Sequence, residues 1–179
     1  MIVAFGDSLT AGLGVDPEAS YPAVLERELA ARGWRYRVVN AGISGDTTGG
    51  GLARVDSVLA YKPEIVILEL GANDGLRGLP IETTRANLEQ LIVALQGAGA
   101  RVVLAGMKLP PNYGADYIRG FERIFIDLAG EHKTARIPFL LEDVAARPGR
   151  MQADALHPNR AGHRIIAATV MKELETMLR

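Results

Sequence analysis

A serine follows the first apolar run of the chain, on a turn that is rich in small residues. The segment runs Phe5-Gly6-Asp7-Ser8-Leu9-Thr10-Ala11-Gly12. A serine hydroxyl is a weak nucleophile until a base removes its proton, and a small turn at a strand end leaves the hydroxyl accessible. Asp and Ser are also common residues at a helix start. Ser8 by itself is therefore equally consistent with a nucleophile and with a helix cap.

A histidine near the C-terminus could supply the missing base. His157 lies three positions after Asp154 and directly before Pro158. At this spacing in a turn, the carboxylate can accept from one ring nitrogen and fix the tautomer while the other nitrogen faces a nucleophile. We interpret His132 and His163 as structural or surface residues. Because the three histidines are scattered along the chain, we predict no metal site.

Two loops between these regions could stabilise negative charge. Asn73 stands in Gly71-Ala72-Asn73-Asp74-Gly75, and Gly45 stands in a Ser-Gly-Asp turn. An amide side chain and backbone N–H groups are the usual donors of an oxyanion hole, so we predict Asn73, Gly45 and the Ser8 N–H as its donors. Asn, Asp and Gly are also the ordinary residues of tight turns. That alternative explains each loop separately but not their recurrence after successive strands.

The elements that must position these residues alternate along the chain. Short apolar segments, several of them β-branched, predict five buried strands at residues 2–5, 36–39, 65–70, 101–105 and 135–139. Helical spacing of apolar residues follows each strand, within residues 24–29, 52–59, 88–95, 117–128 and 166–177. Residues 1–179 therefore predict a single α/β domain, with one parallel sheet covered by helices on both faces.

In a parallel sheet of this kind, the polar loops that follow the strands lie at the same edge of the sheet. Ligands of open α/β sheets bind beyond the carboxyl ends of the strands. Ser8, Gly45 and Asn73 follow the first, second and third predicted strands, and Asp154 and His157 follow the fifth. All five residues should meet at one edge of the sheet.

Four ordered blocks are spread along essentially the whole chain: Gly6-Asp7-Ser8-Leu9, Asn40-Ala41-Gly42-Ile43-Ser44-Gly45-Asp46-Thr47, Gly71-Ala72-Asn73-Asp74 and Asp154-Ala155-Leu156-His157-Pro158. Together with residues 51–54 and 109–114, they resemble the SGNH (GDSL) hydrolases. Within that family the chain is most similar to the bacterial group of thioesterase I, lysophospholipase L1 and arylesterase. The resemblance implies a flavodoxin-like three-layer α/β/α sandwich with a five-stranded parallel sheet. It also implies hydrolysis of acyl esters and thioesters through an acyl-enzyme on Ser8.

The sequence supports expectations for three further features: the loop at residues 107–114, Gly42 and Glu69. The loop at residues 107–114 is partly apolar and contains prolines, so we expect one wall of an acyl groove there, or else a plain connection; the candidate binding residues are Leu109, Pro110, Asn112 and Tyr113. Gly42 stands where the similar family carries serine, which predicts a looser loop around Gly45. Glu69 interrupts an apolar strand, so we expect it either to pair with Arg54 or to project into solvent.

Composition excludes several classes of function. The chain has 20 Lys+Arg, 21 Asp+Glu and no cysteine, so it carries no basic run for nucleic acid and no thiol chemistry. No apolar run approaches the roughly 18 residues of a membrane helix, so we expect no stable membrane insertion. The first strand begins at residue 2, which predicts a cytoplasmic protein if the chain is complete, and a periplasmic or secreted one if a signal peptide was removed. The oligomeric state is not predicted.

The sequence thus predicts a serine esterase that acts on a small acyl-ester or lipid substrate and needs no cofactor. A carbohydrate O-acetylesterase of the same family is the alternative within the hydrolases, because the blocks specify acyl transfer and not the leaving group. A nucleotide- or flavin-binding module is the alternative from another class. It is weakened by the absence of a G-x-G-x-x-G segment after a strand and of a phosphate-binding G-x-x-x-x-G-K-[ST] loop.

Overall fold

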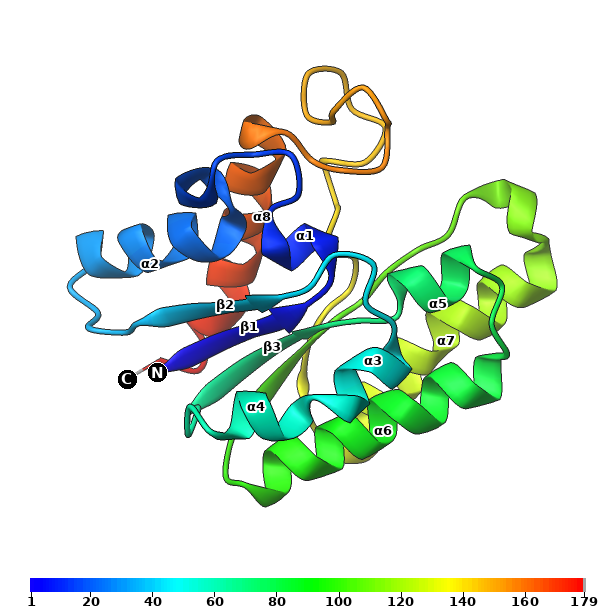
Figure 1. Cartoon of the computed structure of the whole chain (residues 1–179), viewed down its shortest axis with the longest axis horizontal. Helices are drawn as coiled ribbons and strands as arrows, with labels where there is room; N and C mark the ends of the chain where they lie inside the picture. Colours follow the sequence, from blue (N-terminus) through cyan, green and yellow to red (C-terminus); the bar gives the residue numbers. More distant parts are fainter. Residues whose placement is uncertain (179) are drawn as a thin grey trace.

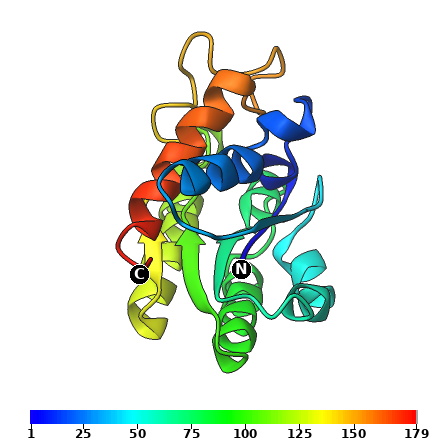
Figure 2. The same cartoon turned by 90° about the vertical axis from the view of Figure 1, so that its left-hand side faces the viewer.

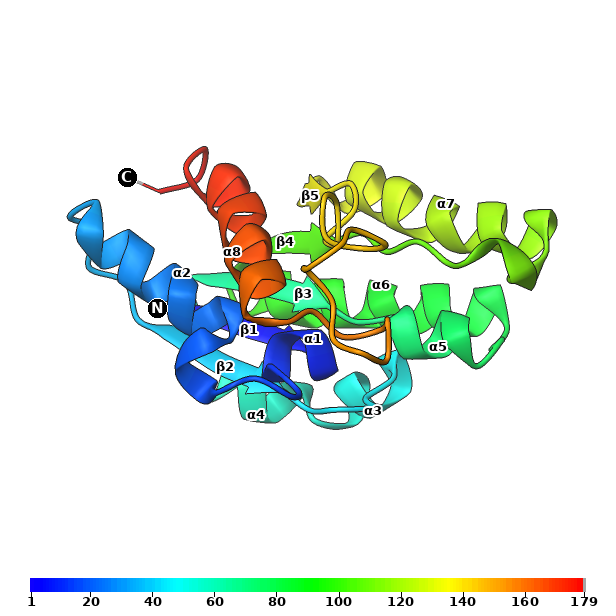
Figure 3. The same cartoon turned by 90° about the horizontal axis from the view of Figure 1, so that it is seen from above.

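A computed structural model describes residues 1–178 and contains one five-stranded parallel sheet (Figure 1). The strands are β1 (Ile2–Gly6), β2 (Val38–Gly42), β3 (Ile65–Glu69), β4 (Arg101–Ala105) and β5 (Ala135–Ile137). Their spatial order is β2-β1-β3-β4-β5, with β2 and β5 at the edges (Figure 3). β1 and β3 are buried along their whole length, as expected for strands covered on both faces.

Helices cover both faces of the sheet. One face carries α1 (Ser8–Ala11), α2 (Tyr21–Ala31) and α8 (Arg160–Leu174), and α2 crosses α8 there (Figure 2). The other face carries α3 (Thr48–Ala53), α4 (Val55–Leu59), α6 (Ile81–Gly97) and α7 (Ala115–His132) (Figure 1). The short α5 (Ala72–Leu76) follows β3, and 3-10 turns span Pro17–Ala19 and Pro111–Tyr113. The predicted three-layer arrangement is confirmed.

Several predicted elements differ from the observed ones, and the fifth strand ends at Ile137 instead of at residue 139. The helix expected over residues 52–59 is two short helices, because the backbone breaks at Arg54 (φ −120°, ψ 11°), whose carbonyl oxygen accepts from Ser57. The second strand lies at residues 38–42 and not 36–39. Pairing with β1 extends it through Asn40 and Gly42, although both are turn-type residues.

Gly42 has a packing role that differs from the expected loosening of its loop. A Cβ atom at this position would lie 2.2 Å from the Ala11 nitrogen. The absence of a side chain therefore lets α1 lie directly on the end of β2. The loop that contains Gly45 starts from a tightly packed point.

No helix within residues 1–178 is both long and apolar enough to cross a bilayer.

Candidate active site

Ser8 is the first residue of α1, at the carboxyl end of β1. Asp7 caps this helix, since its Oδ1 accepts from the Leu9 N–H at 2.9 Å. Gly12 ends the helix in the left-handed conformation (φ 81°). Asp7 therefore caps the helix while Ser8 stands at its first position, so a capping role for this segment is compatible with a nucleophile at Ser8.

His157 and Asp154 reach Ser8 from the loop before α8. His157 Nε2 lies 3.0 Å from Ser8 Oγ although the two residues are 149 positions apart, and His157 Nδ1 lies 2.6 Å from Asp154 Oδ2. Ala155 has a positive φ of 57°, which closes the turn between the acid and the imidazole. The arrangement is a hydroxyl, a base and an orienting carboxylate in hydrogen-bond contact.

The carboxylate of Asp154 is held by its own turn. Its Oδ1 accepts from the backbone N–H groups of Leu156 and His157, each at 3.0 Å. These bonds, led by the His157 N–H, lower the pKa of Asp154 to about 2. Asp154 is therefore ionised at neutral pH and can fix the imidazole so that Nε2 faces Ser8.

Gln152 ties this loop to the segment that follows α1. Its Nε2 donates to the Leu13 carbonyl oxygen at 2.7 Å and to the Pro158 carbonyl oxygen at 2.9 Å. Gln152 thereby joins the N-terminal segment that carries Ser8 to the C-terminal loop that carries His157.

The three candidate oxyanion donors differ in whether their N–H groups already have hydrogen-bond acceptors. Within residues 1–178, the Ser8 and Gly45 N–H groups donate to no protein acceptor. The Asn73 amide nitrogen instead donates to Asp7 Oδ2 at 2.9 Å and to the Asp46 carbonyl oxygen at 3.0 Å. Asn73 thus links the loops after β1, β2 and β3, and both of its N–H hydrogens already have acceptors.

The expected pair between Arg54 and Glu69 is wrong. Arg54 Nε donates to Asp46 Oδ2 at 2.7 Å, and its two terminal nitrogens donate to the carbonyl oxygens of Ala41 and Gly6. Glu69 does not project into solvent either, because it is 0% exposed. Its Oε2 accepts from the Asp7 N–H at 3.1 Å and from Thr10 Oγ1 at 2.8 Å. Arg54 is therefore a clamp for the loop that contains Gly45, and Glu69, at the end of β3, holds the segment that contains Ser8.

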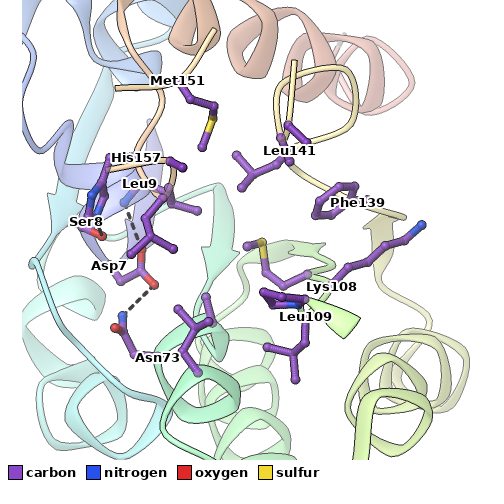
Figure 4. Close-up of a pocket in the computed structure, with 18 of the residues that line it drawn as sticks. Asp7, Ser8, Leu9, Asn73, Lys108, Leu109, Phe139, Leu141, Met151 and His157 are labelled. Carbon is purple, nitrogen blue, oxygen red and sulfur yellow. Dashed lines mark hydrogen bonds between the residues drawn. The ribbon is translucent and has the colours of Figure 1, made fainter. Parts of the chain in front are cut away.

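An apolar groove of about 440 Å³ opens beside Ser8 and His157 (Figure 4). Leu109 and Pro110 line it, whereas Asn112 and Tyr113 do not. The Tyr113 hydroxyl instead donates to the Leu76 carbonyl oxygen at 2.7 Å. The opposite wall comes from the segment after β5, at Phe139, Leu141, Ala145, Ala146 and Met151. The sequence predicted Phe139 only as the end of a strand, and it gave no prediction for the other wall residues because they show no helical or strand period.

One group of possible metal ligands also escaped the sequence analysis. The side-chain ligand atoms of Glu89, Glu131 and His132 lie within 4.8 Å of one another, on α6 and α7. Arg85 forms ion pairs with both glutamates, at 3.0 Å and 2.5 Å. Arg85 is one cation shared by two carboxylates, and through it the cluster links α6 to α7.

The sequence of this chain matches a known protein family. Residues 4–165 match the model of the GDSL-like lipase/acylhydrolase family. The chain belongs to this family. The match includes Ser8, Gly45, Asn73, Asp154 and His157.

Similar members of the GDSL-like family cover almost the whole chain. Esterase TesA of Pseudomonas aeruginosa is 44% identical over 99% of this chain and 89% of its own length. Thioesterase 1/protease 1/lysophospholipase L1 of Escherichia coli strain K12 is 38% identical over 99% of this chain and 84% of its own length. A crystal structure of TesA superposes with a TM-score of 0.95, covering 99% of both chains.

Proposed function

We propose that this chain is a serine hydrolase that cleaves carboxylic esters and thioesters through an acyl-enzyme on Ser8. The observation that carries the proposal is the continuous contact from Asp154 through His157 to Ser8 Oγ. Membership of the GDSL-like lipase/acylhydrolase family supports the same chemistry. The names of the similar proteins extend it to esters and thioesters.

The proposed reaction has two steps. Ser8 Oγ attacks the acyl carbonyl while His157 Nε2 takes its proton, and the resulting imidazolium protonates the leaving alcohol or thiol. A water molecule then attacks the acyl-enzyme with His157 again as the base. The Ser8 and Gly45 N–H groups, which have no acceptor within residues 1–178, and the Asn73 amide would donate to the oxyanion of each step.

The groove favours an acyl chain longer than acetyl. Its volume of about 440 Å³ lies in the usual range of small-molecule sites, and its walls are mostly aliphatic and aromatic. An acetyl group would leave most of this apolar surface in water, whereas a longer chain would cover it at about 0.8 kcal/mol per buried methylene. The O-acetylesterase alternative therefore receives less support than a lipid-type esterase.

A p-nitrophenyl acyl series, from acetyl upwards, tests this substrate class, with an acyl-CoA and a lysophospholipid measured beside it. We expect kcat/KM to rise with acyl length until the groove is filled. Replacing Leu141 with Trp should shorten the preferred chain, because Leu141 lies on the groove wall. A maximum at acetyl would instead favour the O-acetylesterase.

Substitution of Ser8 tests the mechanism itself. Ser8→Ala should reduce ester hydrolysis to near background without unfolding the protein, and a fluorophosphonate probe should label the wild type at Ser8 alone. Ser57→Ala is the matched control, because the Ser57 hydroxyl is exposed and donates to the Arg54 carbonyl oxygen. An active Ser8→Ala protein, or a label on another residue, would refute the mechanism.

A further inference from the structure

Two acidic side chains are buried together beneath the candidate nucleophile. Asp7 is 1% exposed and Glu69 is 0% exposed. They stand at the ends of the adjacent strands β1 and β3, where Gly6 and Glu69 are register partners. A buried ionised carboxylate needs strong compensation, so two neighbouring carboxylates would not both ionise readily.

The hydrogen bonds of the two carboxyl groups are unequal. Each Asp7 oxygen accepts an N–H bond, Oδ1 from Leu9 and Oδ2 from the Asn73 amide, both at 2.9 Å. In Glu69, Oε2 takes both available donors, while the buried Oε1 has no hydrogen-bond partner. Each carboxyl group thus accepts two hydrogen bonds, but a negative charge on Asp7 meets a donor at both oxygens, whereas on Glu69 it meets donors at Oε2 alone. The unpartnered Oε1 is the natural position for a proton.

The local packing is built around the Glu69 carboxyl. A Cβ atom at position 6 would lie 2.3 Å from Glu69 Oε2, so only glycine lets the carboxyl approach the Asp7 N–H. Tyr21 Oη lies 3.1 Å from Thr10 Oγ1, which in turn donates to Glu69 Oε2. These hydroxyl groups form a directed chain from α2 toward the acid.

We propose that Asp7 and Glu69 hold one proton between them, on Glu69, and that the Asp7 carboxylate retained in this way positions the Asn73 amide for the oxyanion. This inference rests on the proposed function of Asn73. Asp7 keeps one amide hydrogen of Asn73 throughout the reaction. The developing oxyanion competes with the neutral Asp46 carbonyl for the second hydrogen, and an anion is the stronger acceptor.

The charged groups around the pair are consistent with a single negative charge. Burial is the main influence that raises the pKa of Glu69 well above its ordinary value, and the charge of Asp7 raises it further. Burial also raises the pKa of Asp7, to about 6, against the lowering influence of its hydrogen bonds and of His157. Tyr21 on α2 faces the Asp7–Glu69 pair through Thr10. The Arg54 guanidinium donates to the Gly6 carbonyl oxygen, and its charge is paired with Asp46.

Infrared spectroscopy of the wild-type protein tests the proton directly. At pH 7 we expect a carbonyl band of a protonated carboxylic acid that shifts when glutamate side-chain carboxyls carry ¹³C and does not shift with labelled aspartate. Glu69→Gln should remove the band. A spectrum without such a band, or a band that follows aspartate labelling, would overturn the proposal. Ser8→Ala should keep the band, so this result is independent of whether Ser8 is the nucleophile.

Kinetics test the positioning role. Asp7→Asn should lower kcat by about 10–100-fold with little change in KM, because a charge-assisted hydrogen bond to Asn73 is lost. Glu69→Gln should stay within a few-fold of the wild type, since an amide keeps the acceptor oxygen and resembles the protonated acid. Wild-type kcat in a folded Asp7→Asn protein, or equal damage in both variants, would overturn the role.

Asp74→Asn is the matched control for the kinetic test. Asp74 is also a buried acid of the Asn73 loop, 1% exposed, but its carboxylate accepts from the Thr48 N–H and hydroxyl. This variant should lower the melting temperature without the kcat-specific loss of Asp7→Asn. A kcat loss in Asp74→Asn as large as in Asp7→Asn would assign the Asp7 effect to general loosening of the loop and overturn its positioning role.

Discussion

Asp154 shows how a single turn can orient a carboxylate toward an imidazole. Its two oxygens together accept three hydrogen bonds, from the Leu156 N–H, the His157 N–H and His157 Nδ1. Two of these bonds come from the backbone of the turn itself, so the carboxylate orientation does not depend on distant packing. The imidazole is thereby presented to Ser8 by residues within three positions of it.

Substitution of the three histidines should have clearly different effects on activity. His157→Ala should be nearly as damaging as Ser8→Ala, because the two residues act as a unit and their losses do not add. His132→Ala should retain most activity, because its ring contacts Glu89 on α6 and not Ser8. His163→Ala should do the same, since its Nδ1 accepts from the Tyr21 N–H. Steady-state kinetics on folded variants decide the matter, and an inactive His132 or His163 variant would show that the base is misassigned.

At the scale of elements, the loops after β1, β2 and β3 are held to one another by side chains. Arg54 lies at the break between α3 and α4, contacts the carbonyl oxygens of Gly6 and Ala41, and pairs with Asp46. Its guanidinium also lies 4.6 Å from the centre of the Phe5 ring. The break between α3 and α4 therefore places the Arg54 side chain where it can contact the ends of β1 and β2 and the loop that contains Gly45.

Removing the Arg54 clamp should reduce both stability and turnover. Arg54→Met should lower the free energy of unfolding by at least about 1.5–3 kcal/mol, the usual worth of a hydrogen bond to a charged group. It should also lower kcat, because the Gly45 loop loses its hold. Arg27→Met is the control, since Arg27 forms an exposed pair with Glu18, and should change stability by less than about 0.5 kcal/mol. Equal urea unfolding curves for the two variants would contradict the clamp.

At the scale of the whole molecule, the crossing of α2 and α8 contains a buried titratable contact. His163 on α8 is 1% exposed, and its Nδ1 accepts from the N–H of Tyr21, the first residue of α2. Ser20, the N-cap residue of α2, makes no capping bond with its side chain. His163 therefore serves as an N-terminal acceptor supplied by another helix, and it can accept only while its ring is neutral.

Acid should weaken the fold through His163. Burial lowers the pKa of His163 from 6.5 to about 4. The unfolded chain then binds more protons than the native state as the pH falls from about 6.5 to about 4, so this residue subtracts stability across that window. The raised pKa of Asp7 acts in the opposite sense, because the native state binds its proton first.

His163→Gln isolates this contribution, because glutamine can accept from the Tyr21 N–H and does not titrate. Urea unfolding from pH 7 to pH 4.5 should give a smaller loss of stability in the variant than in the wild type. All other titrating groups are common to both proteins and cancel in the difference. Parallel pH profiles would show that His163 does not carry the acid sensitivity.

The alternation of strands and helices and the location of the polar loops could be predicted from the sequence. Apolar period and glycine or proline punctuation are local properties, so they predicted five strands and the two-sided layering that the structure confirms. Because parallel strands end at one edge of the sheet, the positions of Ser8, Gly45 and Asn73 after successive strands placed them together. The spacing of Asp154 and His157 is likewise local, and it predicted their contact.

The pairing of side chains from non-consecutive segments could not be predicted in this way, because it depends on the packed fold. The order β2-β1-β3 brings Glu69 beside Asp7 and leaves Arg54 to Asp46, a choice that no local pattern encodes. The second groove wall comes from an irregular segment after β5, whose apolar residues have no period to detect. The two acceptors of the Asn73 amide belong to different loops, so their convergence depends on the packed sheet. Periodicity reports burial along one element, whereas hydrogen-bond partners depend on distances between elements.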